Sequence, residues 1–246
     1  VPPDENFLPD MEVFQNSINI NTRGVLINSP NNPSGIVYDD KTLSEMCQII
    51  KEKEVEFGTE IYLVSDEPYR KIIFDDLEYN HIFNYHDRSI VATSHSKDLA
   101  LPGERIGYIA VNPSCPDLEE LVDGLVFCNR TLGFVNAPAL IQHLITHLQD
   151  TTIDVKVYEK KRDYLYEELT DMGYSLIKPQ GAFYMFPKSP IEDDVKFSEE
   201  LKENRVLVVP GRGFGLPGYF RISYCMEDAT IRGSLEGLEK AISKYR

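Results

Sequence analysis

One short stretch of the sequence combines an amine, hydroxyls and a guanidinium. Lys97 follows Ser94 by three residues and Ser96 directly, and Arg105 lies eight residues beyond the lysine, after a Pro-Gly pair. A lysine amine becomes a Schiff-base nucleophile only when its surroundings favour loss of its proton. A hydroxyl and a guanidinium directed at one point suit a phosphate, because the guanidinium offers a forked, charge-assisted contact. Taken alone, Lys97 would be an ordinary solvated lysine.

A carboxylate and a phenol follow an earlier apolar run. Asp66 comes directly after the run 61–65, and Tyr69 lies three residues later in Asp-Glu-Pro-Tyr. A carboxylate at the end of a buried strand costs free energy unless it is paired or hydrogen-bonded. The sequence therefore indicates either a cap or turn aspartate, or an acid with a specific partner.

Two further polar residues follow or interrupt predicted strands. Asn32 lies in Asn-Asn-Pro-Ser-Gly after the run 24–28, and most such stretches are simply turns. Arg221 lies within the run 219–224, where strand alternation predicts that it faces away from its apolar neighbours. From the strand pattern alone, this arginine would lie on a solvated face.

The first half of the chain alternates strand and helix patterns. We expect strands over 24–28, 61–65, 89–93 and 105–111, and a helix over 41–54. This alternation predicts an α/β fold with a layered, mostly parallel sheet and right-handed crossovers. The polar residues come just after strand ends, where open α/β sheets bind ligands.

The second half is mainly helical. We expect helices over 118–132, 138–148, about 158–172 and 195–204, and a last helix with Asp228 as its N-cap. Short strands are expected over 175–177, 183–186, 206–209 and 219–224. The sequence thus predicts a large domain over 1–145 and a smaller α+β domain over 146–246. Gly-Arg-Gly-Phe-Gly at 211–215 is interpreted as a turn, because no helix follows it to hold a dinucleotide.

Composition narrows the function classes. The chain has 246 residues, 42% hydrophobic content and a net charge of −15, which is ordinary for a globular protein and argues against nucleic acid as a partner. Its apolar runs are strand-sized, so no membrane segment is expected. Four scattered cysteines without metal-ligand spacing predict reduced thiols, no metal site and a cytoplasmic location.

In their order along the chain, the stretches around Asn32, Asp66, Lys97 and Arg221 resemble the class I/II (fold type I) pyridoxal-phosphate-dependent aminotransferases. The resemblance implies a three-layer, mostly parallel but incomplete large domain and a smaller C-terminal α+β domain. It also implies pyridoxal 5'-phosphate as cofactor, with one role for each matching residue. For the cofactor these roles are Lys97 for the covalent bond, Ser94 and Arg105 for the phosphate, Asp66 for the pyridine nitrogen, and Tyr69 and Asn32 for the phenolic oxygen. For the substrate they are Arg221 for the carboxylate, Asn32 as a further contact and Tyr184 as a weaker one. Lys97, Asp66 and Tyr69 are the expected catalytic residues.

The resemblance implies transfer of an amino group from an L-amino acid to a 2-oxo acid by a cytoplasmic homodimer. It begins partway into the family pattern, so we expect this chain alone to bind the cofactor weakly or not at all and to be inactive. A carbon–sulfur β-lyase on the same fold and the effector half of an aminotransferase-like transcription regulator remain alternatives. Substrate choice is not readable, although Arg205 and Arg212 hint weakly at acidic substrates.

Overall fold

The computed structural model describes residues 1–246 and divides the chain into two units. The first unit comprises residues 1–29, 37–71 and 78–153, and the second comprises residues 30–36, 72–77 and 154–246. The sequence analysis had placed the boundary at 145/146 and both short stretches in the first domain. Main-chain hydrogen bonds explain the difference, because the carbonyl of Gly35 accepts from Gly181 and that of Ile72 accepts from Ala182, each at 2.9 Å.

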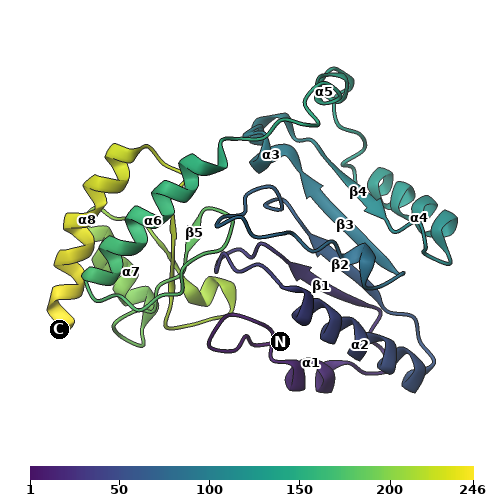
Figure 1. Cartoon of the computed structure of the whole chain (residues 1–246), viewed down its shortest axis with the longest axis horizontal. Helices are drawn as coiled ribbons and strands as arrows, with labels where there is room; N and C mark the ends of the chain where they lie inside the picture. The colour runs from purple at the N-terminus through teal and green to yellow at the C-terminus, as the bar shows by residue number, and fades with distance from the viewer. The chain divides into compact units, whose positions relative to one another are not determined.

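A four-stranded sheet forms the centre of the first unit (Figure 1). Its strands are β1 (Gly24–Asn28), β2 (Tyr62–Asp66), β3 (Ser89–Ser94) and β4 (Gly107–Val111), in that spatial order. The first three are parallel and β4 runs antiparallel to β3, so the α/β prediction is confirmed with a mixed sheet. The link from β3 to β4 contains only the short helix α3 (His95–Asp98) and the 3-10 turn η2 (Pro102–Glu104). It lacks the long helix that usually carries a chain back to start a parallel strand.

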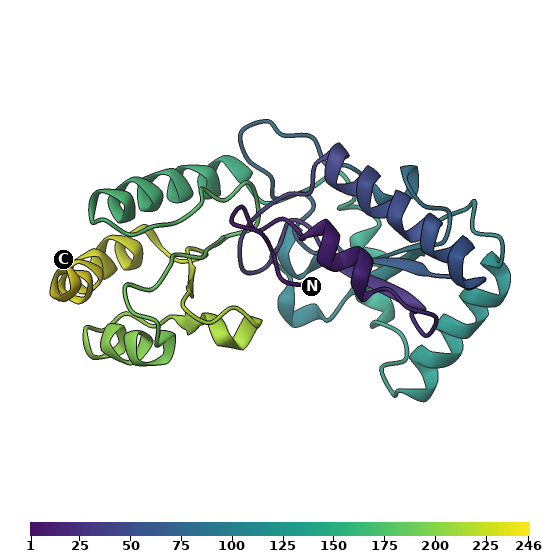
Figure 2. The same cartoon turned by 90° about the horizontal axis from the view of Figure 1, so that it is seen from below.

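Two helices cover one side of this sheet, α1 (Met11–Ser17) and α2 (Asp40–Phe57), as Figure 2 shows. Helix α2 confirms the helix predicted over 41–54 and extends it at both ends. It buries Leu43, Met46 and Ile50 at helical spacing, and they pack in one apolar cluster with strand residues of the sheet. This packing fixes the strand ends that carry the candidate site.

Two further helices of the first unit follow β4. They are α4 (Leu118–Thr131) and α5 (Ala139–Ile145), close to the predicted ranges. Helix α4 buries none of its residues, and Phe127 on it is 66% exposed. The helix therefore presents an apolar surface that this chain does not cover.

Three helices and a small antiparallel sheet form the second unit. The helices are α6 (Val155–Asp171), α7 (Asp194–Glu203) and α8 (Asp228–Ile242), and the strands β5 (Tyr184–Met185), β7 (Phe220–Ser223) and β6 (Val209–Pro210) pair in that order. Aromatic rings fill its core: the ring of Phe220 lies 5.3 Å from that of Phe197 and 5.9 Å from that of Tyr174, between centres. The α+β character predicted for the C-terminal part is thus confirmed.

Three local predictions for this unit were wrong. Residues 175–177 form no strand, because Ser175 accepts a single main-chain hydrogen bond from Lys188 and no ladder continues from it. Asp228 is the first residue of α8, and Glu227 is its N-cap. The strand predicted over 206–209 is not formed by residues 206–208, because β6 begins only at Val209. The glycine-rich stretch that was interpreted as a turn is the short 3-10 helix η3 (Gly211–Phe214), after β6.

The structure also bears on the cysteines and on membrane insertion. Cys47, Cys115, Cys128 and Cys225 are all free thiols. None of the helices combines the length and apolarity needed to cross a lipid bilayer.

Candidate functional site

Lys97 and Tyr69 lie at the carboxyl ends of neighbouring strands in the first unit. Lys97 is on α3, which begins directly after β3, and Tyr69 is on the turn that follows β2. The lysine Nζ lies 5.9 Å from the centre of the tyrosine ring, and that ring is 4% exposed. Because β2 and β3 are parallel and adjacent, the fold brings the predicted amine and phenol together.

Asp66 ends β2 and is bonded to a residue that the sequence analysis did not select. Asn28, at the end of β1, donates from Nδ2 to the Asp66 carbonyl at 2.8 Å and lies 3.4 Å from Oδ2 of its carboxylate. Burial raises the pKa of Asp66, although part of its side chain remains open to solvent. Both residues end neighbouring parallel strands, so aligning the two predicted strand ends would have found Asn28.

The two predicted phosphate contacts lie near the junction of β3 and β4. Ser94 precedes α3 as its N-cap, and its hydroxyl makes no capping hydrogen bond. Arg105 is exposed, adopts a left-handed backbone (φ +51°) and donates from Nη1 to the Pro102 carbonyl at 2.7 Å. The strands approach closely here, since a Cβ on Gly107 would lie only 2.3 Å from the Thr93 carbonyl oxygen. The close pairing holds Arg105, two residues before Gly107, near the end of β3.

Arg221 and Asn32 lie together in the second unit. Arg221 is on β7 and donates from Nη1 to Asn32 Oδ1 at 2.8 Å. Its guanidinium carbon lies 4.4 Å from the ring centre of Tyr184 and 4.8 Å from that of Phe214. Its Nε is buried without a hydrogen-bond partner. A guanidinium held between two rings with an unused N–H is suited to bind a carboxylate.

Phe214 is the second residue that the sequence analysis missed. It ends η3, in the glycine-rich stretch that was interpreted only as a turn. Its contact with Arg221 shows that this stretch helps to hold the arginine flat. No pattern in the sequence marks this contact, because it joins η3 to a different strand.

Arg212 is occupied by hydrogen bonds to two neighbouring aspartates. Its guanidinium and its main-chain N–H bind the fully buried Asp194, at 2.8 to 3.1 Å, and it also binds Asp193. Burial alone would raise the pKa of Asp194, but the hydrogen bonds and charge of Arg212 lower it. The structure therefore gives no support to the hint that Arg212 recognises acidic substrates.

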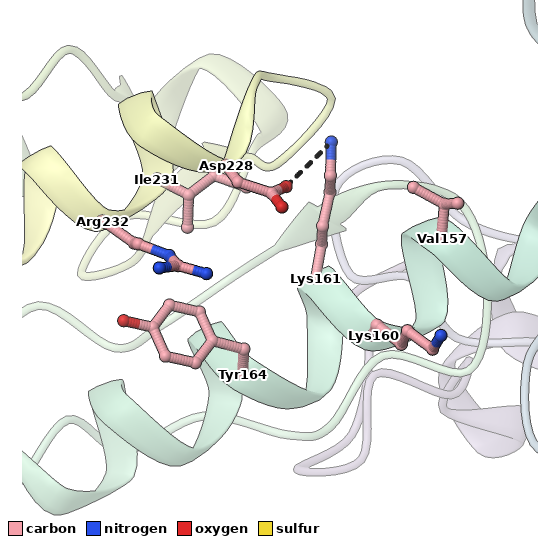
Figure 3. Close-up of a pocket in the computed structure, with 7 residues that line it drawn as sticks. All are labelled: Val157, Lys160, Lys161, Tyr164, Asp228, Ile231 and Arg232. Atoms are coloured by element: carbon pink, nitrogen blue, oxygen red, sulfur yellow. Dashed lines mark ion pairs between the residues drawn. The ribbon is translucent and has the colours of Figure 1, made fainter.

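A separate hollow of about 340 Å³ lies between α6 and α8 in the second unit (Figure 3). It is lined by Val157, Lys160, Lys161, Tyr164, Asp228, Ile231 and Arg232. Across it, Lys161 Nζ points to the Asp228 carboxylate at 3.5 Å, and the Arg232 guanidinium lies over the Tyr164 ring at 5.9 Å from its centre. None of the predicted site residues lines this hollow.

Comparisons with known proteins find similar sequences over almost the whole chain. The family model described as "Aminotransferase class I and II" matches residues 1–238. A "Probable aspartate aminotransferase" of Methanocaldococcus jannaschii is 34% identical over 97% of this chain and 63% of its own length. The "Aspartate aminotransferase" of Thermotoga maritima is 30% identical over 96% of this chain and 60% of its own length.

A solved structure is also very similar. The crystal structure of an amino transferase from Eubacterium rectale superposes with a TM-score of 0.97 at 44% identity, covering 100% of this chain and 62% of that one. The chain thus spans about three fifths of the length of these relatives. Since the family model matches nearly the whole sequence, the chain belongs to the class I and II aminotransferase family.

Proposed function

We propose that the intact protein transfers an amino group from an L-amino acid to a 2-oxo acid, with pyridoxal 5'-phosphate bound to Lys97. The observation that carries this proposal is the position of the Lys97 amine, 5.9 Å from the ring centre of the buried Tyr69. Asp66 ends β2, three residues before Tyr69. Family membership supports the same reaction class.

The chemical groups of the residues named in the sequence analysis fit this cofactor. The hydroxyl of Ser94, which makes no capping hydrogen bond to α3, and the exposed guanidinium of Arg105 would hold the phosphate. Asp66 would pair with the ring nitrogen, and the side chains of Tyr69 and Asn32 would bind the phenolic oxygen. When bound, pyridoxal 5'-phosphate supplies a ring that withdraws electrons from the substrate's Cα.

Asp66 must be ionised to keep a positive charge on its partner. Burial raises the pKa of its carboxyl, so in this structure the ionised form is disfavoured. A cation at hydrogen-bond distance would reverse that shift, because an opposite charge within about 4–6 Å favours the charged form of an acid. The hydrogen bonds from Asn28 hold the strand end in place for this pair.

Lys97 would act as the proton carrier of the reaction. Its amine would take the proton from the Cα of the substrate as a general base and then return a proton as a general acid. The short helix α3 holds this amine beside Tyr69, at the carboxyl end of the sheet. A lysine on a longer mobile loop would be oriented less well.

Arg221 would bind the α-carboxylate of the substrate. Its buried Nε lacks a partner and its Nη1 is already oriented by Asn32, so the guanidinium presents an aligned edge. The rings of Tyr184 and Phe214 prevent it from rotating away. This arrangement suits amino acids as a class, and the engaged Arg212 gives no preference for acidic side chains.

We further propose that the intact protein is a cytoplasmic homodimer and that the 246-residue chain alone binds the cofactor weakly. The four free thiols suit a reducing compartment. The exposed apolar side chains of α4, such as Phe127 and Val126, suit coverage by another protein surface. Titration of the purified 246-residue chain with pyridoxal 5'-phosphate tests the last point, and tight binding would contradict it.

An amino-group transfer assay on the intact protein tests the function. A panel of L-amino acids is supplied with a 2-oxo acid, and both the new amino acid and any ammonia are measured. We expect amino acid to form in proportion to donor consumed, with activity lost in Lys97→Ala. Release of ammonia and pyruvate without transfer would instead identify a β-lyase and contradict the proposal.

A further inference from the structure

An ion pair joins the two segments that carry Lys97 and Tyr69. Lys71 Nζ lies 3.7 Å from the Asp98 carboxylate; the Asp98 side chain is 10% exposed and the Lys71 side chain is partly exposed. Asp98 is the residue after Lys97 on α3, and Lys71 is two residues after Tyr69. The ion pair therefore connects α3 to the segment after β2, and these two segments carry residues proposed to bind one cofactor.

His95 is a second side chain in contact with Asp98. Its Nδ1 lies 3.2 Å from Oδ2 of Asp98, and both residues are 7% exposed. The imidazole ring also lies 6.0 Å, between centres, from the ring of Tyr108 on β4. The hydroxyl of Tyr108 accepts a hydrogen bond of 2.6 Å from Arg70, the neighbour of Lys71. A second chain of contacts thus runs from the Tyr69 turn to α3.

The segment just before α6 holds both ends of the ion pair. The Asp98 carbonyl accepts from Ile153 N at 2.8 Å and from the hydroxyl of Thr152 at 3.2 Å. Lys71 donates to the Gln149 carbonyl at 3.0 Å. These bonds restrict movement of α3 along the sheet, and α3 is only four residues long. A helix this short depends on such tertiary contacts for its position.

We propose that Asp98 is a positioning residue: through its ion pair with Lys71 and its contact with His95, it holds the Lys97 helix against the segment that carries Tyr69. The inference rests on the proposed function, because it concerns the lysine assigned to the cofactor. Asp98, Lys71 and His95 would position Lys97 without themselves binding the cofactor.

Asp98 directly follows Lys97 on α3, so we expect its ion pair with Lys71 to affect the charge near the Lys97 amine as well. The charged or titratable groups around this corner are His95 on α3, Tyr69, Arg70 and Lys71 on the turn, and Tyr108 on β4. Removing the positive charge of Lys71 leaves the Asp98 anion unbalanced, which favours the protonated form of a neighbouring amine. Removing the negative charge of Asp98 leaves the cation unbalanced and has the opposite effect.

The pH dependence of Lys97 reactivity tests this role in the cofactor-free intact protein. Reductive methylation is followed as a function of pH, and modification of the peptide containing Lys97 is measured by mass spectrometry. We expect Lys71→Met to raise the pH midpoint by about half a unit or more and Asp98→Asn to lower it by a similar amount. The double variant and the conservative Lys71→Arg should both stay close to wild type.

The matched control is Lys53→Met, which removes an ion pair with Glu56 on α2 (2.7 Å). It should leave the Lys97 midpoint unchanged. If Lys71→Met and Asp98→Asn lower the melting temperature but keep the wild-type midpoint, the two residues are merely structural and the proposal fails. If Asp98→Asn does not fold, the Lys97 midpoint in Lys71→Met alone tests the proposal. Lys71 is partly exposed, so we expect this variant to fold.

Adding pyridoxal 5'-phosphate separates this inference from the proposed function. Borohydride reduction followed by peptide analysis reports whether wild-type Lys97 takes up the cofactor. Absence of label on Lys97 would refute the proposed function, while the midpoints in the cofactor-free protein would still decide the positioning role. With label on wild-type Lys97, we expect about a severalfold lower apparent affinity in Asp98→Asn and an affinity close to wild type in Lys71→Arg.

Discussion

Asn28 donates a hydrogen bond of 2.8 Å to the main-chain carbonyl of Asp66, and its amide lies 3.4 Å from the carboxylate of the same residue. The two residues are paired in register at the ends of β1 and β2. One side chain thus fixes both the backbone and the carboxylate of the acid proposed to face the ring nitrogen. We therefore expect Asn28 to help prepare the proposed cofactor site.

Replacing Asn28 should weaken cofactor binding without unfolding the protein. We expect Asn28→Ala to reduce the affinity for pyridoxal 5'-phosphate about fivefold, because a net hydrogen bond contributes about 1 kcal/mol. Equilibrium titration of the intact protein, followed by cofactor absorbance, measures the change. Asn21→Ala, in the exposed turn before β1, is the matched control and should bind as wild type does. Equal affinities for both variants would remove Asn28 from the site.

Asp66 should make the cofactor-free protein less stable at neutral pH. Its folded-state pKa is raised by burial, so the folded state holds the proton more tightly than the unfolded state does. The ionised carboxylate therefore destabilises the fold above that raised pKa, and the penalty disappears as the pH falls below the ordinary value of 3.8. We expect Asp66→Asn to be more stable than wild type at pH 7, with the difference vanishing near pH 3.

Urea unfolding of the cofactor-free wild type and Asp66→Asn at several pH values checks this prediction. The quantity to compare is the difference in unfolding free energy between the two proteins at each pH, because the other carboxylates titrate equally in both. Saturating cofactor should reverse the order at pH 7, since the cation would then favour ionised Asp66. A difference independent of pH would show that Asp66 does not carry a raised pKa.

Arg221→Lys should weaken substrate binding more than cofactor binding. Lysine lacks the planar fork, so it cannot make two parallel bonds to a carboxylate or lie flat between Tyr184 and Phe214. A lost charge-assisted bond of about 1.5–3 kcal/mol corresponds to a rise in KM of about 10- to 100-fold. Steady-state kinetics of amino-group transfer measure it, with cofactor absorbance as the control. An unchanged KM for every amino acid tested would exclude Arg221 from carboxylate binding.

Arg162 should stabilise the second unit. It is 0% exposed and binds both carboxylate oxygens of Asp75, at 2.6 and 2.7 Å, and the Pro179 carbonyl at 2.9 Å. Arg162→Met leaves the carbonyl without its donor and removes the partner of the half-exposed Asp75 carboxylate, which should cost about 1–3 kcal/mol of unfolding free energy. Denaturant unfolding measures this loss. The exposed pair of Lys240 and Glu236 offers a control, and Lys240→Met should change stability little.

Much of the fold was predictable because its central elements carry strong local patterns. The strand predicted over 24–28 coincides with β1, and the strands predicted over 61–65 and 89–93 end within one residue of β2 and β3. Alternating apolar runs and helical spacing identify such elements without tertiary information. The direction of β4 was not predictable in this way, since periodicity is the same for parallel and antiparallel strands.

The individual site residues could be selected from the sequence, but their supporting contacts could not. Lys97 and Asp66 follow strand ends, and that position alone makes them candidates. The contact of Phe214 with Arg221 and the pair of Lys71 with Asp98 join segments separated along the chain. Such contacts depend on how loops pack, and no local periodicity encodes packing.

Covalent capture of the cofactor tests the central claim most directly. The intact protein is incubated with pyridoxal 5'-phosphate, reduced with borohydride, digested and examined by peptide mass spectrometry. The account predicts one dominant label, on the peptide that contains Lys97, and loss of both label and visible cofactor absorbance in Lys97→Ala. A label spread over other lysines, or visible absorbance that persists in Lys97→Ala, would contradict it.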